Sequence, residues 1–97
     1  MSKGYWVVEV DVTDPDAYKL YTDQVRPYLD RVGGRFIVRG GASERVEGTG
    51  RPRLVVVEFA SYEAALTAYS SDEYQAMVKL RQAGAMADFA VVEGFDG

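Results

Sequence analysis

Cysteine and histidine are both absent from the 97 residues of this chain. The lack of cysteine excludes a disulfide framework and thiol catalysis. The lack of histidine removes the commonest metal ligand and the commonest acid–base group at neutral pH, which argues against zinc, haem and serine–histidine–aspartate sites. A glycine-rich phosphate-binding fingerprint between a strand and a helix is missing as well. We therefore expect a protein that uses no metal and no other cofactor.

Basic charge and long apolar runs are also scarce. The formal net charge is −4, whereas binding to nucleic acid and attachment to anionic membranes both require a basic surface. The sequence has no apolar run of transmembrane length and no secretory signal pattern. We therefore expect a cytoplasmic protein that binds neither nucleic acid nor membranes.

The most informative stretch is a short strand enclosed by two glycine pairs. Alternation along this strand places Phe36 and Val38 on one face and Arg35, Ile37 and Arg39 on the other. A strand face with two arginines around an isoleucine is expected to meet acids, a ligand or another sheet. The strand therefore predicts a buried or ligand-binding sheet face.

Periodicity divides the rest of the chain, which we interpret as one domain over residues 1–97, since 47% of it is apolar. Asp14 and Pro15 are typical of a helix start. Ser70 and Glu73 have the spacing of a capping box that restarts a second helix after a break. The predicted elements are a strand over 4–12, a helix over 15–33, strands over 35–39 and 53–60, a hairpin-like arm over 42–52, a broken helix over 61–84 and a strand over 88–95.

This β-α-β-β-α-β order predicts an α+β, ferredoxin-like fold: a four-stranded antiparallel sheet with both helices on one face. The face without helices still carries many apolar residues, too many to stay exposed on a monomer. A second copy of the chain would cover this face and pair its acids with its arginines, so we expect a homodimer. The residues assigned to the open face are Tyr5, Val7, Ile37, Leu54 and Val56, with Glu9, Arg39 and Glu58 among them.

Short motifs along nearly the whole chain resemble one family. They are Gly4-Tyr5-Trp6, Asp14-Pro15-Asp16-Ala17-Tyr18, Gly34-Arg35-Phe36, Val38-Arg39-Gly40-Gly41, Val57-Glu58-Phe59, residues 69–75, Leu80-Arg81-Gln82 and Val92-Glu93-Gly94. As an ordered set they are similar to the domain-of-unknown-function family numbered 1330, although Ala60 and Asp72 stand where its members usually have proline. The resemblance implies the dimeric α/β-barrel superfamily, which also holds cofactor-free monooxygenases, isomerases and dehydratases of small aromatic or lactone compounds. It implies no particular reaction for the family itself.

Arg39 and Glu58 form the first candidate site, because alternation assigns both to the open sheet face. An arginine among carboxylates can hold an anionic or enolate substrate through two hydrogen bonds, and a carboxylate there can act as a base. The alternative is an ion pair that only fixes the register of the dimer.

Tyr69, Ser71 and Tyr74 flank the predicted helix break and form the second candidate site. At a break, side chains can point into a pocket, where phenols donate to a carbonyl oxygen or stack on a ring. Arg81 follows Tyr74 by seven residues, lies on the same helix face and can bind a carboxylate. The alternatives are tyrosines that pack at the edge of the core and an arginine that is solvated or caps its helix.

The sequence therefore predicts a homodimer that binds a small organic acid or aromatic compound. The alternative is a non-catalytic ligand-binding or assembly module. A water-poor cavity beside a titratable group and a donor distinguishes an enzyme from such a module. In a cofactor-free enzyme of isomerase or monooxygenase type, the catalytic residues would be Glu58 and Tyr69, and the substrate-binding residues would be Arg39, Ser71, Tyr74 and Arg81.

Overall fold

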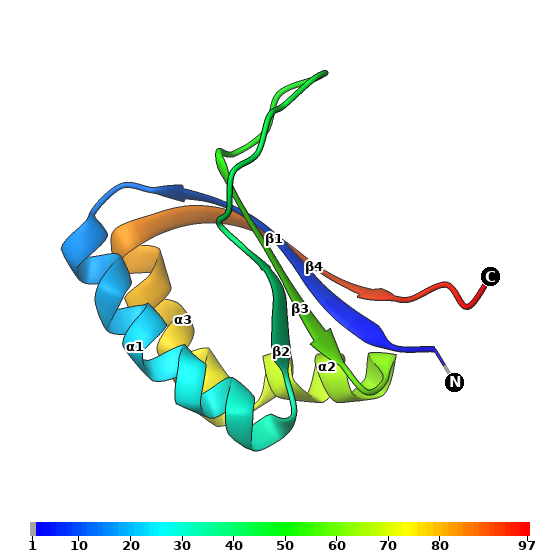
Figure 1. The fold of residues 1–97 in the computed structure, drawn as a ribbon. Helices are drawn as coiled ribbons and strands as arrows, with labels where there is room; N and C mark the ends of the chain where they lie inside the picture. The colour runs from blue at the N-terminus through cyan, green and yellow to red at the C-terminus, as the bar shows by residue number, and fades with distance from the viewer. Residues whose placement is uncertain (1) are drawn as a thin grey trace.

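A four-stranded antiparallel sheet with helices on one face forms the fold of residues 2–97, the part of the chain that the computed structural model describes (Figure 1). The elements are β1 (Gly4–Val12), α1 (Pro15–Val32), β2 (Arg35–Arg39), β3 (Arg53–Phe59), α2 (Tyr62–Ser70), α3 (Asp72–Gly84) and β4 (Ala85–Glu93). The strands lie in the order β2-β3-β1-β4. This confirms the predicted ferredoxin-like arrangement, with the second helical region divided into α2 and α3.

Capping groups fix both ends of α1. The Asp14 carboxylate accepts a hydrogen bond from the N–H of Ala17 at 3.2 Å, and Pro15 fills the first helical position, as predicted. Gly33 ends the helix in a left-handed conformation with a φ of 81°. Pro27 lies inside α1 without ending it, so α1 is a single helix of 18 residues.

The break between α2 and α3 occurs where the sequence predicts it, but a different serine forms the cap. The Ser71 hydroxyl accepts a hydrogen bond from the N–H of Tyr74 at 3.1 Å, whereas Ser70 is the last residue of α2. The Glu73 carboxylate binds Arg31 of α1 instead of closing a capping box. The predicted Ser70–Glu73 box is therefore wrong, because the chain becomes extended one residue later, at Ser71.

The last strand follows α3 without a connecting loop. β4 begins at Ala85, earlier than the predicted Asp88. The Gly84 carbonyl accepts hydrogen bonds from the N–H groups of Thr13 at 2.9 Å and Asp14 at 3.1 Å. A side chain at Gly84 would overlap the backbone at the start of α1, so only glycine allows this close approach. The contact joins the beginning of α1 to the end of α3.

The core lies between the sheet and the helices, as alternation along β1 predicts. Trp6, Val8 and Val10 point toward the helices and are at most 6% exposed. The indole N–H of Trp6 donates to the carbonyl of Ala65 in α2 at 2.9 Å, which ties the centre of the sheet to that helix. α1 lies beside α3 on the same side of the sheet (Figure 1).

A bulge in β2 reverses part of the predicted alternation. Phe36 pairs with Val57, but the register then shifts and Val38 pairs with Val56. Val38 therefore shares the open face with Val56, and Arg39 lies on the helix side, its guanidinium carbon 4.7 Å from the centroid of the Phe36 ring. The predicted faces of Val38 and Arg39 are wrong, because one extra residue in a strand moves the following side chains to the other face.

Residues 40–52 form an arm that projects from the sheet between β2 and β3 (Figure 1). Two ion pairs bind its base to β1 and β4, namely Arg45 with Glu9 at 2.7 Å and Arg51 with Asp88 at 3.2 Å. No strand pairing occurs within the arm. The predicted hairpin-like arm is therefore a long loop without a ladder of its own.

Candidate functional site

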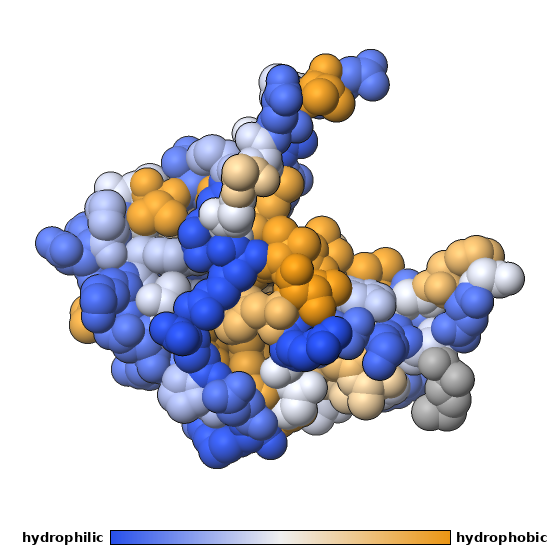
Figure 2. Space-filling model, viewed as in Figure 1, coloured by the Kyte–Doolittle hydropathy of each residue, from blue (hydrophilic) through white to orange (hydrophobic). Residues whose placement is uncertain are grey.

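A small cavity lies between the sheet and the helices. Its volume is about 30 Å³, which is room for about one water molecule. Apolar and aromatic side chains form most of its wall, and Figure 2 shows apolar atoms between α1 and the edge strand β2. The residues that line it are Trp6, Val8, Val10, Tyr18, Tyr21, Val25, Leu29, Phe36, Val55, Val57, Arg81 and Phe89.

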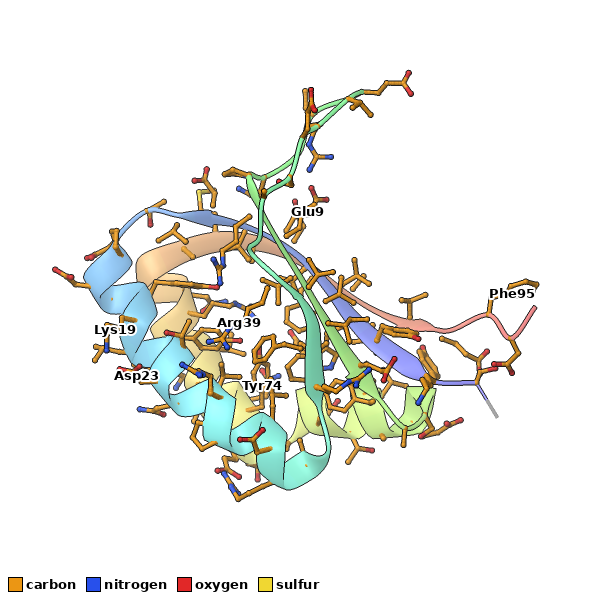
Figure 3. The ribbon with its side chains drawn as sticks, in the orientation of Figure 1. Glu9, Lys19, Asp23, Arg39, Tyr74 and Phe95 are labelled. Atoms are coloured by element: carbon orange, nitrogen blue, oxygen red, sulfur yellow. The ribbon has the colours of Figure 1, made fainter. Side chains whose placement is uncertain are left out.

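Three polar side chains form a hydrogen-bonded chain at this cavity. Arg81, which is 7% exposed, donates from Nη1 to the Tyr74 hydroxyl at 3.0 Å. The hydroxyl oxygens of Tyr74 and Tyr21 lie 2.7 Å apart, and Figure 3 places Tyr74 in the interior between the helices and β2. Because a guanidinium can only donate, Tyr74 accepts from Arg81 and has its own proton available for Tyr21. When Tyr74 donates to Tyr21, the proton of Tyr21, which lines the cavity, is free to point into it.

Burial keeps both hydroxyls of this chain protonated. It raises the pKa of Tyr21 and the pKa of Tyr74 above the ordinary value of a phenol. Burial alone would lower the pKa of Arg81, but the contacts with Tyr74 and Tyr21 more than offset this, and the pKa of Arg81 is raised. At neutral pH the group is therefore a charged guanidinium behind two neutral phenols. It can donate a hydrogen bond to an oxyanion, but it does not serve as a base.

Two more arginines lie beside the cavity, at a place that we call the mouth and define by Arg39 and Arg53. Arg39 covers the ring of Phe36, and the guanidinium carbon of Arg53 lies 5.9 Å from the ring centroid of Tyr18. Both rings line the cavity and are half-buried. A side chain at Gly40 would overlap the Arg53 guanidinium, so Arg53 lies directly against the backbone that follows Arg39.

Glu58 lies on the open face of the sheet, away from this cavity. Its carboxylate is 3.3 Å from Arg35 and 3.7 Å from Lys3, and it accepts a 3.5 Å hydrogen bond from the Tyr5 hydroxyl. The prediction that Arg39 and Glu58 share one sheet face is wrong, because the bulge in β2 turns Arg39 to the helix side. An ion pair does form at Glu58, but its arginine is Arg35.

Tyr69 and Ser71 lie at the break between α2 and α3, and neither lines the cavity. The ring of Tyr69 packs 4.9 Å from Phe89 and 5.6 Å from Tyr74, measured between centroids. The Ser71 hydroxyl caps α3 and lies 2.7 Å from the hydroxyl of Tyr28. Tyr69 therefore packs in the aromatic cluster, and Ser71 stabilises the helix break.

The six predicted site residues thus occupy four places. Their roles in binding or catalysis stay predictions, since placement alone does not test them. Arg81 lines the cavity and is bonded to Tyr74 behind the wall, Arg39 lies at the mouth, Tyr69 and Ser71 lie beside the helix break, and Glu58 lies on the open face.

Reasoning from the sequence missed Tyr21 and Arg53. Helical spacing made Tyr21 look like a packing residue, and only the fold brings it within reach of Tyr74. A signal for Arg53 was present, because strict alternation with the buried Val55 and Val57 already assigns its side chain to the helix side.

Within residues 2–97, no three histidine, cysteine, aspartate or glutamate side chains lie close enough together to hold a metal ion. Over the same residues, no helix is both long enough and apolar enough to cross a membrane.

A family model described as Domain of unknown function (DUF1330) matches residues 3–95. None of the functionally curated proteins has a matching sequence. Solved structures extend the comparison to more distant proteins. One is RPA0582, a protein of unknown function from Rhodopseudomonas palustris, which is 19% identical with a TM-score of 0.73 over 99% of this chain and 85% of its own.

Two further solved structures have described families or activities. SnoaB, a cofactor-independent oxygenase from Streptomyces nogalater, is 11% identical, with a TM-score of 0.70 over 100% of this chain and 97% of its own. An ethyl tert-butyl ether d (ethd) family protein from Bacillus halodurans C-125 is 16% identical, with a TM-score of 0.59 over 98% of this chain and 100% of its own. At these identities the similarity shows a shared fold.

Proposed function

The chain belongs to the DUF1330 family, and we propose that it is a homodimer that binds a small aromatic or keto-acid compound in the cavity between its helices and its sheet. The observation that carries this proposal is the buried chain of Arg81, Tyr74 and Tyr21 beside an otherwise apolar cavity. An apolar pocket with a few convergent polar groups is the usual form of a small-molecule site. The free donor of Tyr21 gives the ligand its orientation.

Stabilisation of an oxyanion is the chemistry that this group supports best. Hydrogen bonds in a chain polarise one another, so the charged guanidinium strengthens the outermost phenol as a donor. An enolate or phenolate oxygen beside Tyr21 is therefore favoured over its neutral form. Such an oxyanion occurs both in keto–enol isomerisation and in oxygenation of an activated ring without a cofactor. SnoaB, which shares the fold, is a cofactor-independent oxygenase.

The substrate itself has to ionise readily. Among the described residues that line the cavity there is no carboxylate, and Glu58 lies on the other sheet face. These residues therefore place no carboxylate base beside the ligand. An acidic phenol or a 1,3-dicarbonyl compound loses a proton to water without such a base. We therefore assign the donor role to Tyr21 and a role in the dimer to the ion pairs of Glu58.

A ring-sized ligand requires the cavity to widen beyond its 30 Å³. The fold offers a route, because β2 is an edge strand and α1 lies mainly along α3. The space between α1 and β2 can therefore open without the loss of pairing inside the sheet. Arg39, which is exposed, can turn away at the same time.

The apolar open face supports the homodimer. Its side chains Val7, Ile37, Val38, Val92 and Met86 are between 40% and 56% exposed. A monomer rarely keeps so many apolar side chains exposed on one sheet face, and a second copy related by a two-fold axis would cover them.

The arm extends this argument to the edge of the sheet. Glu9 and Asp88, which bind the base of the arm, both belong to the open face. Val46 near the tip of the arm is 82% exposed. In a dimer built on the open face, the arm would pack against the partner subunit, and that subunit would cover Val46.

A coloured phenol tests the proposed function. The phenolate form of 4-nitrophenol absorbs visible light, so its ionisation is read directly from the spectrum. Near the pKa of the dye, we expect the protein to raise the phenolate fraction, because Tyr21 stabilises the anion. Tyr21→Phe should lower the ionisation constant of the bound dye about tenfold, which is one pKa unit. Tyr69→Phe is the matched control and should leave the spectrum unchanged.

The oxyanion role is wrong if the bound dye stays in its neutral form, or if Tyr21→Phe behaves like the wild type. Mass spectrometry of compounds incubated with the protein in air separates the two forms of the proposal. Altered compounds indicate the cofactor-free enzyme, and unchanged compounds indicate the ligand-binding module.

A further inference from the structure

We propose that the natural ligand is an organic anion and that its carboxylate lies between Arg39 and Arg53 at the mouth of the cavity. The inference rests on the proposed ligand site and adds the chemical class of the ligand. An aromatic or keto carboxylic acid fits, with its apolar part in the cavity and its second oxygen near Tyr21.

Charge is distributed unevenly between the outside of the domain and the cavity. Acidic residues outnumber basic ones by 15 to 11, so carboxylates are not scarce. Within residues 2–97, however, none of Arg39, Arg53 and Arg81 is within 4 Å of a carboxylate oxygen. The cavity and its mouth therefore carry uncompensated positive charge, which attracts an anion. The basic residues that do have carboxylate partners are Lys3, Lys19, Arg31, Arg35, Arg45 and Arg51.

Arg53 has a hydrogen-bond donor that the chain leaves unused. Its Nε is fully buried and has no acceptor among residues 2–97. Buried donors without a partner are uncommon in folded proteins and need an explanation. A carboxylate that binds the guanidinium through two parallel hydrogen bonds supplies acceptors for this side chain.

Arg39 is held over the cavity wall by packing alone. Its guanidinium lies 4.7 Å from the ring centroid of Phe36, which lines the cavity. Gly40, with a φ of 66°, then brings the backbone against Arg53. The bulge and this glycine together bring two guanidinium groups to the same side of the sheet, at the mouth of the cavity.

The competing explanation is structural. Arg39 and Arg53 would then serve only to cover Phe36 and Tyr18 through cation–π contacts. In that case neutral ligands and anions would bind equally well, and loss of either charge would leave ligand binding unaffected.

Isothermal titration with matched pairs of probes separates these explanations. The probes are benzoate, salicylate and phenylpyruvate, each compared with its neutral amide at low salt. We expect at least one acid to bind the wild type ten times more tightly than its amide. Arg39→Gln and Arg53→Gln should each weaken that binding about tenfold, which is about 1.4 kcal/mol. Arg35→Gln is the matched control, since Arg35 lies in the same strand but binds Glu58 on the open face.

Each result decides the inference. Equal binding of acids and amides overturns it and leaves the proposed ligand site intact. No binding by any acid also overturns it, and the result with 4-nitrophenol then shows independently whether the ligand site fails too. Circular dichroism verifies that the variants fold. If Arg53→Gln does not fold, Arg39→Gln decides alone, because Arg39 is exposed and its removal leaves no buried gap.

Discussion

Tyr74 links two polar side chains of the cavity wall, Tyr21 and Arg81. It is fully buried, bonds to Tyr21 and accepts from Arg81. Tyr74→Phe would leave two buried polar groups without this partner, so we expect the free energy of unfolding to fall by about 1–3 kcal/mol. Urea denaturation followed by the fluorescence of Trp6 measures the loss.

Tyr69→Phe is the control for this variant. None of the hydrogen bonds among residues 2–97 involves the Tyr69 hydroxyl, whose ring lies beside that of Tyr74. We expect a change of less than about 0.5 kcal/mol. Equal losses in the two variants would contradict the assigned hydrogen-bonded chain.

Alkaline pH tests the same two hydroxyls. Because burial raises the folded-state pKa of Tyr21 and of Tyr74, the unfolded chain loses these protons first as the pH rises. Their contribution to stability is therefore complete below about pH 10, the ordinary pKa of tyrosine, and decreases above it. Urea denaturation at about pH 9 and pH 11 should show a smaller decrease for Tyr74→Phe than for the wild type. A decrease of equal size in both would count against a perturbed Tyr74.

Single residues also show where prediction from sequence ends. The inward position of Phe36 follows from simple alternation, whereas the same alternation assigns Arg39, three residues later, to the wrong face. A bulge leaves no distinct trace in a strand of apolar and basic residues, because both registers offer some apolar side chain to each face. The hydrogen bond between Tyr21 and Tyr74 cannot be predicted from the sequence either, since it depends on the packing of α1 against α3.

At the scale of elements, periodicity and capping residues predicted most of the fold. β1 alternates strictly, and Asp14 caps α1 as expected. The predicted break in the second helical region is also present, though the cap is Ser71 and not Ser70. Only Ser70 has a glutamate three residues later, so the capping-box pattern favours the wrong serine. Serine is a good N-cap residue without a box as well, so local sequence alone does not identify Ser71.

The two serines provide a matched pair of variants. The Ser71 hydroxyl caps α3 and contacts Tyr28, so Ser71→Ala should lower the free energy of unfolding by about 1–2 kcal/mol. Ser70 is exposed at the end of α2, and Ser70→Ala should change stability by less than about 0.5 kcal/mol. Thermal unfolding followed by circular dichroism compares them. A larger loss for Ser70→Ala than for Ser71→Ala would indicate that Ser70 is the cap, as the sequence predicts.

At the scale of the whole molecule, the open face determines the proposed assembly. Val56→Asp would place an unpaired charge in the centre of that face, which should weaken the dimer by several kcal/mol, about 3–5. We expect light scattering at micromolar concentration to show one chain mass for this variant and two for the wild type. Thr67→Asp adds the same charge on an exposed part of α2 and should remain dimeric. A wild-type protein with the mass of one chain would refute the dimer.

The most direct test of the account is the NMR signal of the single tryptophan. The indole N–H of Trp6 is buried, bonds to Ala65 and belongs to a side chain that lines the cavity, so only a ligand inside the cavity should move its resonance. During titration with phenylpyruvate we expect this resonance to shift, and the shift to be much smaller in Tyr21→Phe. If the indole resonance stays fixed while signals from the arm or the open face move, the cavity is not the ligand site.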